Sequence, residues 1–263
     1  MPTVDPNFRY VWLIWASIFL LVWTAVFVAS PTVRRPMLWA SALTAPRGLT
    51  EFLFVPAYWN PPSLFDLAHR TGFDIESLIF CFAIGGLAMV SYTVLAPAPE
   101  HDQLRSHLHR WHRAALVSPF IAFGVLLLLP WNPIYPVIAA LFVGALASGL
   151  CRPDLLRNTL VGGGVFLALY TVFLLGLKCL WPGYIETVWN RSGLIAWRPA
   201  GLPPEELLFG FGFGLYWSTV YEHVTWRQSD ALRHRGTTAN RKHTEMTKTL
   251  YHGADSPVGG PRG

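Results

Sequence analysis

The chain has 263 residues, of which 52% are hydrophobic and only 13% are charged. Because soluble domains carry roughly 25% charged residues, this composition excludes an ordinary soluble globular protein and indicates an integral membrane protein. The formal net charge is +5, but the basic residues fall in short polar segments and near the end of the chain, which suits a membrane surface and argues against a nucleic-acid partner.

Seven segments are apolar and close to the roughly 20 residues that a membrane-spanning helix needs. The second is the weakest because it contains Pro46, Arg47 and Glu51, and a six-span reading that leaves it at the membrane surface stays open. The sequence therefore predicts an all-α, polytopic membrane helix bundle. The seven expected spans are residues 10–30, 36–56, 73–97, 114–130, 133–150, 158–177 and 203–226.

The distribution of basic residues predicts the orientation of the chain. With seven spans the termini lie on opposite sides, and most Arg and Lys residues outside the spans fall on the side of the C-terminus. The positive-inside rule then places the C-terminus in the cytoplasm and the N-terminus outside, in a bacterial inner (plasma) membrane. Cys81, Cys151 and Cys179 fall at mid-membrane and at the two opposite faces, so no disulfide is expected.

The sequence resembles itself at a spacing of 129 residues. The Trp59-Asn60 pair matches Trp189-Asn190 after a one-residue gap. A glutamate, two glycines and a Trp-Asn pair in register are hard to attribute to apolar composition alone. The other matches are Gly72 with Gly201, Glu76 with Glu205, Leu78 with Leu207, Phe80 with Phe209, Phe82 with Phe211, Gly85 with Gly214 and Tyr92 with Tyr221.

The repeat predicts how the chain is divided. Residues 1–97 and 133–226 would form two parallel three-helix repeats, joined by residues 98–132, which contain a basic His-rich loop and a linker helix. Residues 227–263 are polar and basic and are expected to form a disordered tail. One linker helix leaves both units pointing the same way, so Glu76 and Glu205 would enter the membrane from the same face.

The stretch 201–217, GLPPEELLFGFGFGLYW, contains the strongest chemical signal. Proline is tolerated in the first turn of a helix, so Pro203-Pro204 predicts a helix start with Glu205 and Glu206 in its first turn. One reading is structural, because acidic groups at a helix start are favoured by the dipole and face lipid headgroups. The other is catalytic: Glu205, Glu206 and Glu76 would supply an acid and a base at an apolar pocket.

Other residues are candidates for the lining of that pocket. Aromatic faces can stabilise a cation, and the repeated Trp-Asn pairs border the spans, although membrane aromatic belts and simple packing explain such aromatics equally well. Arg47 and Glu51 are spaced i, i+4, so an ion pair on one helix face is the alternative for them. The pocket candidates are Trp59, Asn60, Trp189, Asn190, Phe80, Phe209, Arg47 and Glu51.

No metal or cofactor is expected. The loop sequence HDQLRSHLHRWHR contains His107, His109 and His112 without the spacing of a known zinc motif, and it is better interpreted as a basic loop at the headgroups. His223 is expected to be structural. GxGxxG, Walker and CxxC motifs, and the aspartate-rich motifs of membrane prenyltransferases, are all absent from the sequence.

These residues resemble the small membrane-bound lycopene cyclases of the heterodimeric or fused type, over residues 10–226. Pro203-Pro204-Glu205-Glu206 matches the family motif, whereas the first copy, residues 74–77, keeps Glu76 and lacks the proline and the second glutamate. The resemblance implies proton-initiated, redox-neutral cyclisation of a polyene end group, an isomerase-type reaction without a cofactor. It also implies Glu205 and Glu206 as acid and base candidates, with Glu76 as their partner from the other unit.

The expected partners are a hydrophobic polyene or isoprenoid substrate and the lipid bilayer, with a homo-oligomer or contact with other carotenoid enzymes left open. The alternative function is a non-catalytic carotenoid- or lipid-binding membrane protein. A transporter would need polar groups at mid-membrane, and the last five expected spans contain few of them.

Overall fold

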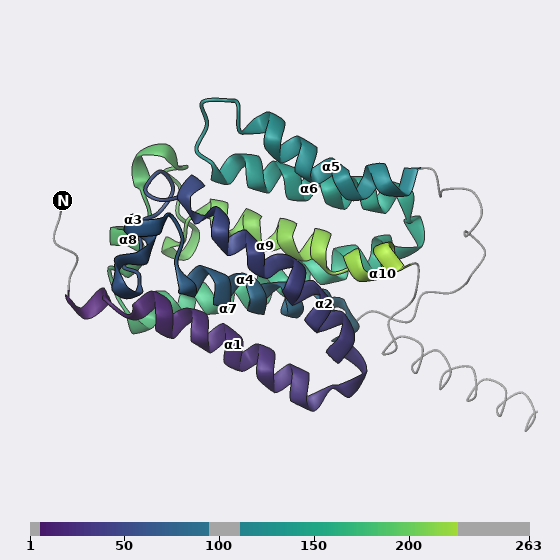
Figure 1. The fold of residues 1–263 in the computed structure, drawn as a ribbon, viewed down its shortest axis with the longest axis horizontal. Helices are drawn as coiled ribbons and strands as arrows, with labels where there is room; N and C mark the ends of the chain where they lie inside the picture. Colours follow the sequence, from purple (N-terminus) through teal and green to yellow (C-terminus); the bar gives the residue numbers. More distant parts are fainter. Residues whose placement is uncertain (1–5, 95–110, 226–263) are drawn as a thin grey trace, which may run out of the picture.

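The computed structural model describes residues 6–94 and 111–225, and within them the chain folds as a bundle of helices (Figure 1). These two ranges contain no strand, only an isolated antiparallel bridge between Trp59 and Trp189. The predicted all-α class is therefore confirmed. The expected tail at 227–263 and most of the expected basic loop lie outside the described residues.

Each of the seven expected spans contains helix, and four helical segments are long and apolar enough to cross a membrane: Val11–Ala29, Ile75–Thr93, Ile134–Cys151 and Pro153–Leu180. The count of seven spans and the repeat remain predictions. The α-helices in the described ranges are α1 (Val11–Ala29), α2 (Arg34–Thr44), α3 (Leu67–Thr71), α4 (Ile75–Val90), α5 (His112–Leu126), α6 (Ile134–Cys151), α7 (Leu156–Leu180), α8 (Tyr184–Val188), α9 (Pro204–Trp217) and α10 (Val220–Thr225).

Apolar side chains project outward from the long helices. Leu21 and Val28 on α1 and Val172 on α7 are more than half exposed, and α1 contains no charged residue. A soluble protein seldom exposes such continuous apolar surface, so these faces suit lipid. Cys81, Cys151 and Cys179 are all free, as the sequence predicts.

The helix α2 continues as a tighter 3-10 helix, η3 (Ala45–Leu53). Pro46 has no backbone N–H and cannot make an α-helical hydrogen bond, which favours this change of pitch. The segment η3 packs on α4, and a Cβ atom at Gly48 would lie 2.7 Å from the backbone nitrogen of Leu78. This close approach brings Arg47 and Glu51 against the interior of the bundle.

Two helices occupy equivalent central places. In the first half α4 packs against both α1 and α2, and in the second half α9 packs against both α6 and α7, while α5 packs on α6. Both α4 and α9 begin at the end of the bundle where α3 and α8 lie (Figure 1). Each is preceded by a glycine with left-handed φ, Gly72 at 82° and Gly201 at 80°, a conformation that side chains disfavour.

Close packing of α9 on α7 predicts that Gly214→Ala destabilises the protein. The added Cβ would lie 2.6 Å from Cβ of Phe166 and 2.9 Å from the carbonyl oxygen of Gly162. Overpacking of this kind typically costs about 1–3 kcal/mol, so we expect a lower midpoint of thermal unfolding in detergent. Gly164→Ala on α7 is the matched control, because nothing lies within 4 Å of its Cβ position. Equal melting of the two variants would contradict this packing.

Candidate active site

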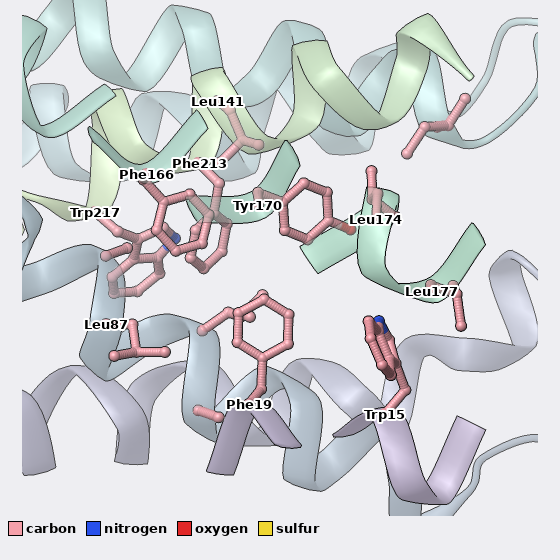
Figure 2. Close-up of a cluster of buried hydrophobic side chains, with 14 of the residues drawn as sticks. Trp15, Phe19, Leu87, Leu141, Phe166, Tyr170, Leu174, Leu177, Phe213 and Trp217 are labelled. Carbon is pink, nitrogen blue, oxygen red and sulfur yellow. The ribbon is translucent and has the colours of Figure 1, made fainter. Parts of the chain in front are cut away.

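A cavity of about 340 Å³ lies between the two halves of the bundle, with walls from α1, η3, α4, α5, α6, α7 and α9. Figure 2 shows part of its surroundings, with Trp15 on α1, Tyr170 and Leu174 on α7, and Phe213 on α9. Sites for small organic molecules usually have volumes of roughly 300–1,000 Å³ and apolar walls with few polar groups. The cavity has the size and the lining of such a site.

Glu206 is the carboxyl group of the first turn of α9 that lines this cavity. It is only 5% exposed. Three donors surround it: the Tyr170 hydroxyl at 2.6 Å, the Trp189 indole N–H at 2.9 Å and the Tyr58 hydroxyl. Three hydrogen bonds from neutral donors offset part of the cost of burying a carboxylate away from water.

Backbone pairing between the halves positions two of these donors. The backbone N–H of Asn60 donates to Val188 O at 2.8 Å, and the backbone N–H of Asn190 donates to Tyr58 O at 2.9 Å. This pairing creates the Trp59–Trp189 bridge. The side chain of Asn190 also donates to Ala57 O at 3.2 Å. Trp59 and Trp189 line the cavity, whereas Asn60 and Asn190 do not and are exposed on these loops.

Tyr58 is a donor that remains protonated. Burial, followed by the neighbouring Glu206 carboxyl, raises the pKa of Tyr58 well above its ordinary value, because both effects disfavour a phenolate. The hydroxyl therefore donates to Glu206 throughout the physiological pH range.

A second carboxyl group, that of Glu51 on η3, also lines the cavity. It is 6% exposed and accepts a hydrogen bond from the Ser77 hydroxyl at 3.0 Å. Its other oxygen accepts no hydrogen bond, although the Trp59 indole lies near. Glu51 therefore has much less polar support than Glu206.

Arg47 lines the cavity four residues before Glu51 on the same segment, η3. Its guanidinium lies over the rings of Trp217, at 4.9 Å, and Phe120, at 5.2 Å. No ion pair joins Arg47 to Glu51 among the described residues. Cation–π contacts thus take the place of the ion pair that the i, i+4 spacing allowed.

Glu205 is fully buried but faces the loops instead of the cavity. It accepts hydrogen bonds from the Tyr135 hydroxyl at 2.8 Å and from the backbone N–H of Ile195 at 2.7 Å. The side chain thereby attaches the loop before α9 to the start of α6. Adjacent residues of an α-helix point about 100° apart, which explains why the two glutamates of the motif have different surroundings.

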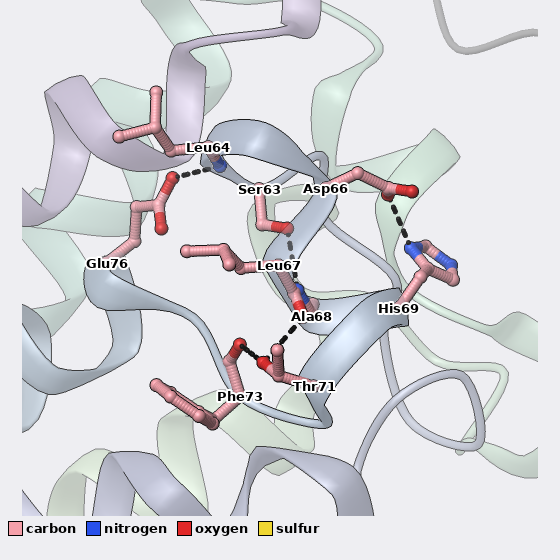
Figure 3. Close-up of polar contacts among 9 residues, drawn as sticks. All are labelled: Ser63, Leu64, Asp66, Leu67, Ala68, His69, Thr71, Phe73 and Glu76. Atoms are coloured by element: carbon pink, nitrogen blue, oxygen red, sulfur yellow. Dashed lines mark hydrogen bonds and ion pairs between the residues drawn. The ribbon is translucent and has the colours of Figure 1, made fainter.

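Glu76 lies in the first turn of α4, as Glu205 lies in the first turn of α9. It is 1% exposed, and Figure 3 shows its carboxyl group accepting from the backbone N–H of Leu64, at 2.7 Å. Asp74 caps the same helix by accepting from the N–H of Ser77. Glu76 does not line the cavity and fixes the loop between η3 and α4.

Phe80 and Phe209, which match in the predicted repeat, both line the cavity. The ring of Phe80 lies 5.2 Å from that of Trp12, and the ring of Phe209 lies 5.9 Å from that of Tyr170. Their faces border the same space from opposite halves of the bundle.

The sequence analysis missed Tyr58, Tyr170 and Ser77. Tyr170 carried a usable signal, because a hydroxyl group in the middle of an apolar span needs a partner. Tyr58 immediately precedes the Trp59-Asn60 pair, but nothing in the sequence alone connects it to a glutamate so far along the chain. Ser77 lies 129 residues before Glu206, so in the predicted repeat it occupies the place of the second glutamate. Its hydrogen bond to Glu51 could not be inferred from that match.

Residues 132–224 match the family model described as lycopene cyclase. No curated protein and no solved structure matches the chain significantly. The matched range agrees closely with the expected second unit and contains Trp189, Glu205 and Glu206. The resemblance to this family that the sequence predicts is confirmed for residues 132–224, which are similar to the lycopene cyclase family model.

Proposed function

We propose that this chain is an intramembrane carotenoid or isoprenoid cyclase that closes a ring at the end of a polyene by a proton-initiated reaction. The observation that carries this proposal is the cluster of three donors around Glu206, which faces an apolar, aromatic cavity. Such a cavity suits a hydrocarbon. The carboxylate of Glu206, positioned by its three donors, would supply a base where the hydrocarbon would lie. The match of residues 132–224 to the lycopene cyclase family supports the same activity.

The reaction needs one acid and one base. A proton added to a terminal alkene carbon forms a carbocation, an internal double bond attacks that cation to close the ring, and loss of a ring proton restores a neutral alkene. One proton enters and one leaves, so the product is an isomer of the substrate and no oxidant or reductant is consumed. The faces of Trp59, Phe80 and Phe209 would stabilise the cation.

We assign the base to Glu206 and the acid to Glu51. The three hydrogen bonds to Glu206 stabilise its ionised form. Glu51, with a single hydroxyl donor, lacks the partners that a buried charge needs, which suits a neutral carboxyl able to deliver a proton. Transfer of the proton from Glu206 back to Glu51 completes the cycle.

The repeat offers a reason for the place of Glu51. Ser77 stands where the second unit has Glu206, and its hydroxyl donates to Glu51 at 3.0 Å. The carboxyl missing from the first copy of the motif is thus replaced at nearly the same place by one from η3. Glu205 and Glu76, each bound to a loop N–H, act in this proposal as positioning residues for the starts of α9 and α4.

We also propose the two parallel three-helix units at residues 1–97 and 133–226. Equivalent packing of α4 and α9, the paired glycines Gly72 and Gly201, and the reciprocal hydrogen bonds between residues 58–60 and 188–190 support them. In a plasma membrane with the N-terminus outside, both helix starts and Glu206 would lie toward the outer leaflet.

The direct test is expression of the full chain in bacterial cells that accumulate lycopene or another acyclic polyene. We expect products of unchanged mass and altered chromatographic retention, with ring protons visible by NMR. A protein that purifies with an unaltered polyene or lipid would instead be a non-catalytic binding protein. Absence of cyclised products from every polyene supplied, with the protein folded in the membrane, would refute the cyclase.

Removal of the Tyr58 hydroxyl is predicted to slow turnover. Tyr58→Phe keeps the ring and removes one of the three donors to Glu206. Because a hydrogen bond to a charged group contributes about 1.5–3 kcal/mol, we expect turnover to fall by roughly tenfold to hundredfold. Tyr10→Phe is the control, since Tyr10 is 48% exposed; equal initial rates of cyclisation for the two variants would remove Tyr58 from the site.

A further inference from the structure

Three potential metal ligands meet at the end of the bundle opposite the starts of α4 and α9. They are His112 at the start of α5, Cys151 at the end of α6 and His223 in α10. One donor atom from each lies within 4.8 Å of the other two. Figure 1 shows these three helix ends together at one end of the molecule.

The cluster is sheltered from water. Cys151 is 3% exposed and His223 is fully buried, while His112 is partly buried. The rings of His112 and His223 stack almost parallel, with centroids 4.6 Å apart. Two imidazoles and a thiol in one buried group form a donor set well suited to a borderline or soft divalent ion.

We propose that His112, Cys151 and His223 form a binding site for a divalent transition metal, with Zn²⁺ as the best chemical fit. Bonds of about 2.0 Å from zinc to nitrogen and 2.3 Å to sulfur would place the donors roughly 3.5 Å apart in a tetrahedral shell. Side-chain rotations of the two rings and the thiol could bring the present spacing to that value. With three protein ligands, a fourth position remains for water or a further group.

The nearby charges permit a cation. Arg152 follows Cys151 directly, but its guanidinium is bound to Asp154, with nitrogen–oxygen distances of 2.6 and 2.9 Å. Asp154 therefore offsets the repulsion that the guanidinium would exert on a metal ion. The site would fasten α5, α6 and α10 together and is independent of the cavity and of the cyclisation chemistry.

The test is loading of the full chain with Co²⁺, after purification in detergent without a polyhistidine tag. We expect one ion per chain and a near-ultraviolet charge-transfer band from thiolate to Co²⁺. Cys151→Ser should abolish the band and weaken binding by more than the roughly 10–100-fold that loss of an outer-shell partner costs. Cys179→Ser, at an exposed cysteine, should keep the band.

His112→Gln provides a second variant at a less buried ligand and should also lose affinity. Zn²⁺ is expected to raise the thermal unfolding midpoint of the wild type and of Cys179→Ser but not that of Cys151→Ser. Absence of the thiolate band in the wild type would overturn the proposal. So would a band or a stoichiometry that survives Cys151→Ser, because the ion would then be bound by other groups, such as the remaining histidines of the 101–112 sequence.

Discussion

Glu206→Gln is expected to lower the rate of ring formation by about 10²–10⁴-fold, the usual contribution of a positioned general base. The amide has nearly the shape of the carboxyl group, so the apolar cavity is preserved. It cannot accept a proton from the ring, however, and its NH₂ group faces at least one of the three donors of Tyr58, Tyr170 and Trp189. Initial rates of product formation in membranes containing equal amounts of protein measure the effect.

The matched control is Glu186→Gln, which makes the same chemical change at an exposed position on α8. It should keep the wild-type rate. Retention of a polyene by purified Glu206→Gln would show that the cavity is intact and that the chemical step is lost. A Glu206→Gln protein with more than about a tenth of the wild-type rate would exclude this residue as the base.

Glu51→Gln is expected to have an effect of similar size, about 10²-fold or more, for the opposite reason. The amide can still accept the hydrogen bond from Ser77 at the place where Glu51 accepts it now, at 3.0 Å. It has no acidic proton to deliver to an alkene, so the first step would be blocked. The measurement is again the initial rate, together with deuterium incorporation into the ring from D₂O.

Glu51→Asp separates acid chemistry from packing. It keeps an acidic group in the cavity and should retain part of the activity, whereas Glu51→Gln should not. Equal loss in the two variants would indicate that Glu51 acts by shape alone. Wild-type turnover in Glu51→Gln would assign the acid to another group and leave the proposal for Glu206 unaffected.

Much of the helical architecture follows from short-range sequence features. Apolar runs predicted where helices occur, and Pro203-Pro204 predicted the start of α9 within one residue, because proline restricts where a helix can begin. Among the residues predicted for the pocket, Trp59, Trp189, Phe80, Phe209, Arg47 and Glu51 line the cavity. Aromatic and ionisable residues in apolar segments are rare enough to be recognised individually.

The sequence alone could not predict which of the two neighbouring glutamates, Glu205 or Glu206, faces the cavity. Glu205 and Glu206 are chemically identical, and only the packing of α6 and α7 around α9 decides which of them meets the cavity. The donors of Glu206 come from remote parts of the chain, and their approach depends on the backbone pairing of Tyr58 with Asn190. The cluster of His112, Cys151 and His223 is likewise assembled from three helices without any local motif.

The guanidinium of Arg47, stacked on Trp217, gives the interior a lengthwise electrical gradient. Residues 206 and 217 are the beginning and end of one helix, so at 1.5 Å per residue the carboxylate and the guanidinium are separated by roughly 16 Å along it. If a linear hydrocarbon acquired positive charge at one end, that end would be attracted by the Glu206 carboxylate and repelled by the Arg47 guanidinium. In the proposed reaction, this gradient would hold the protonated polyene in one orientation while the ring closes.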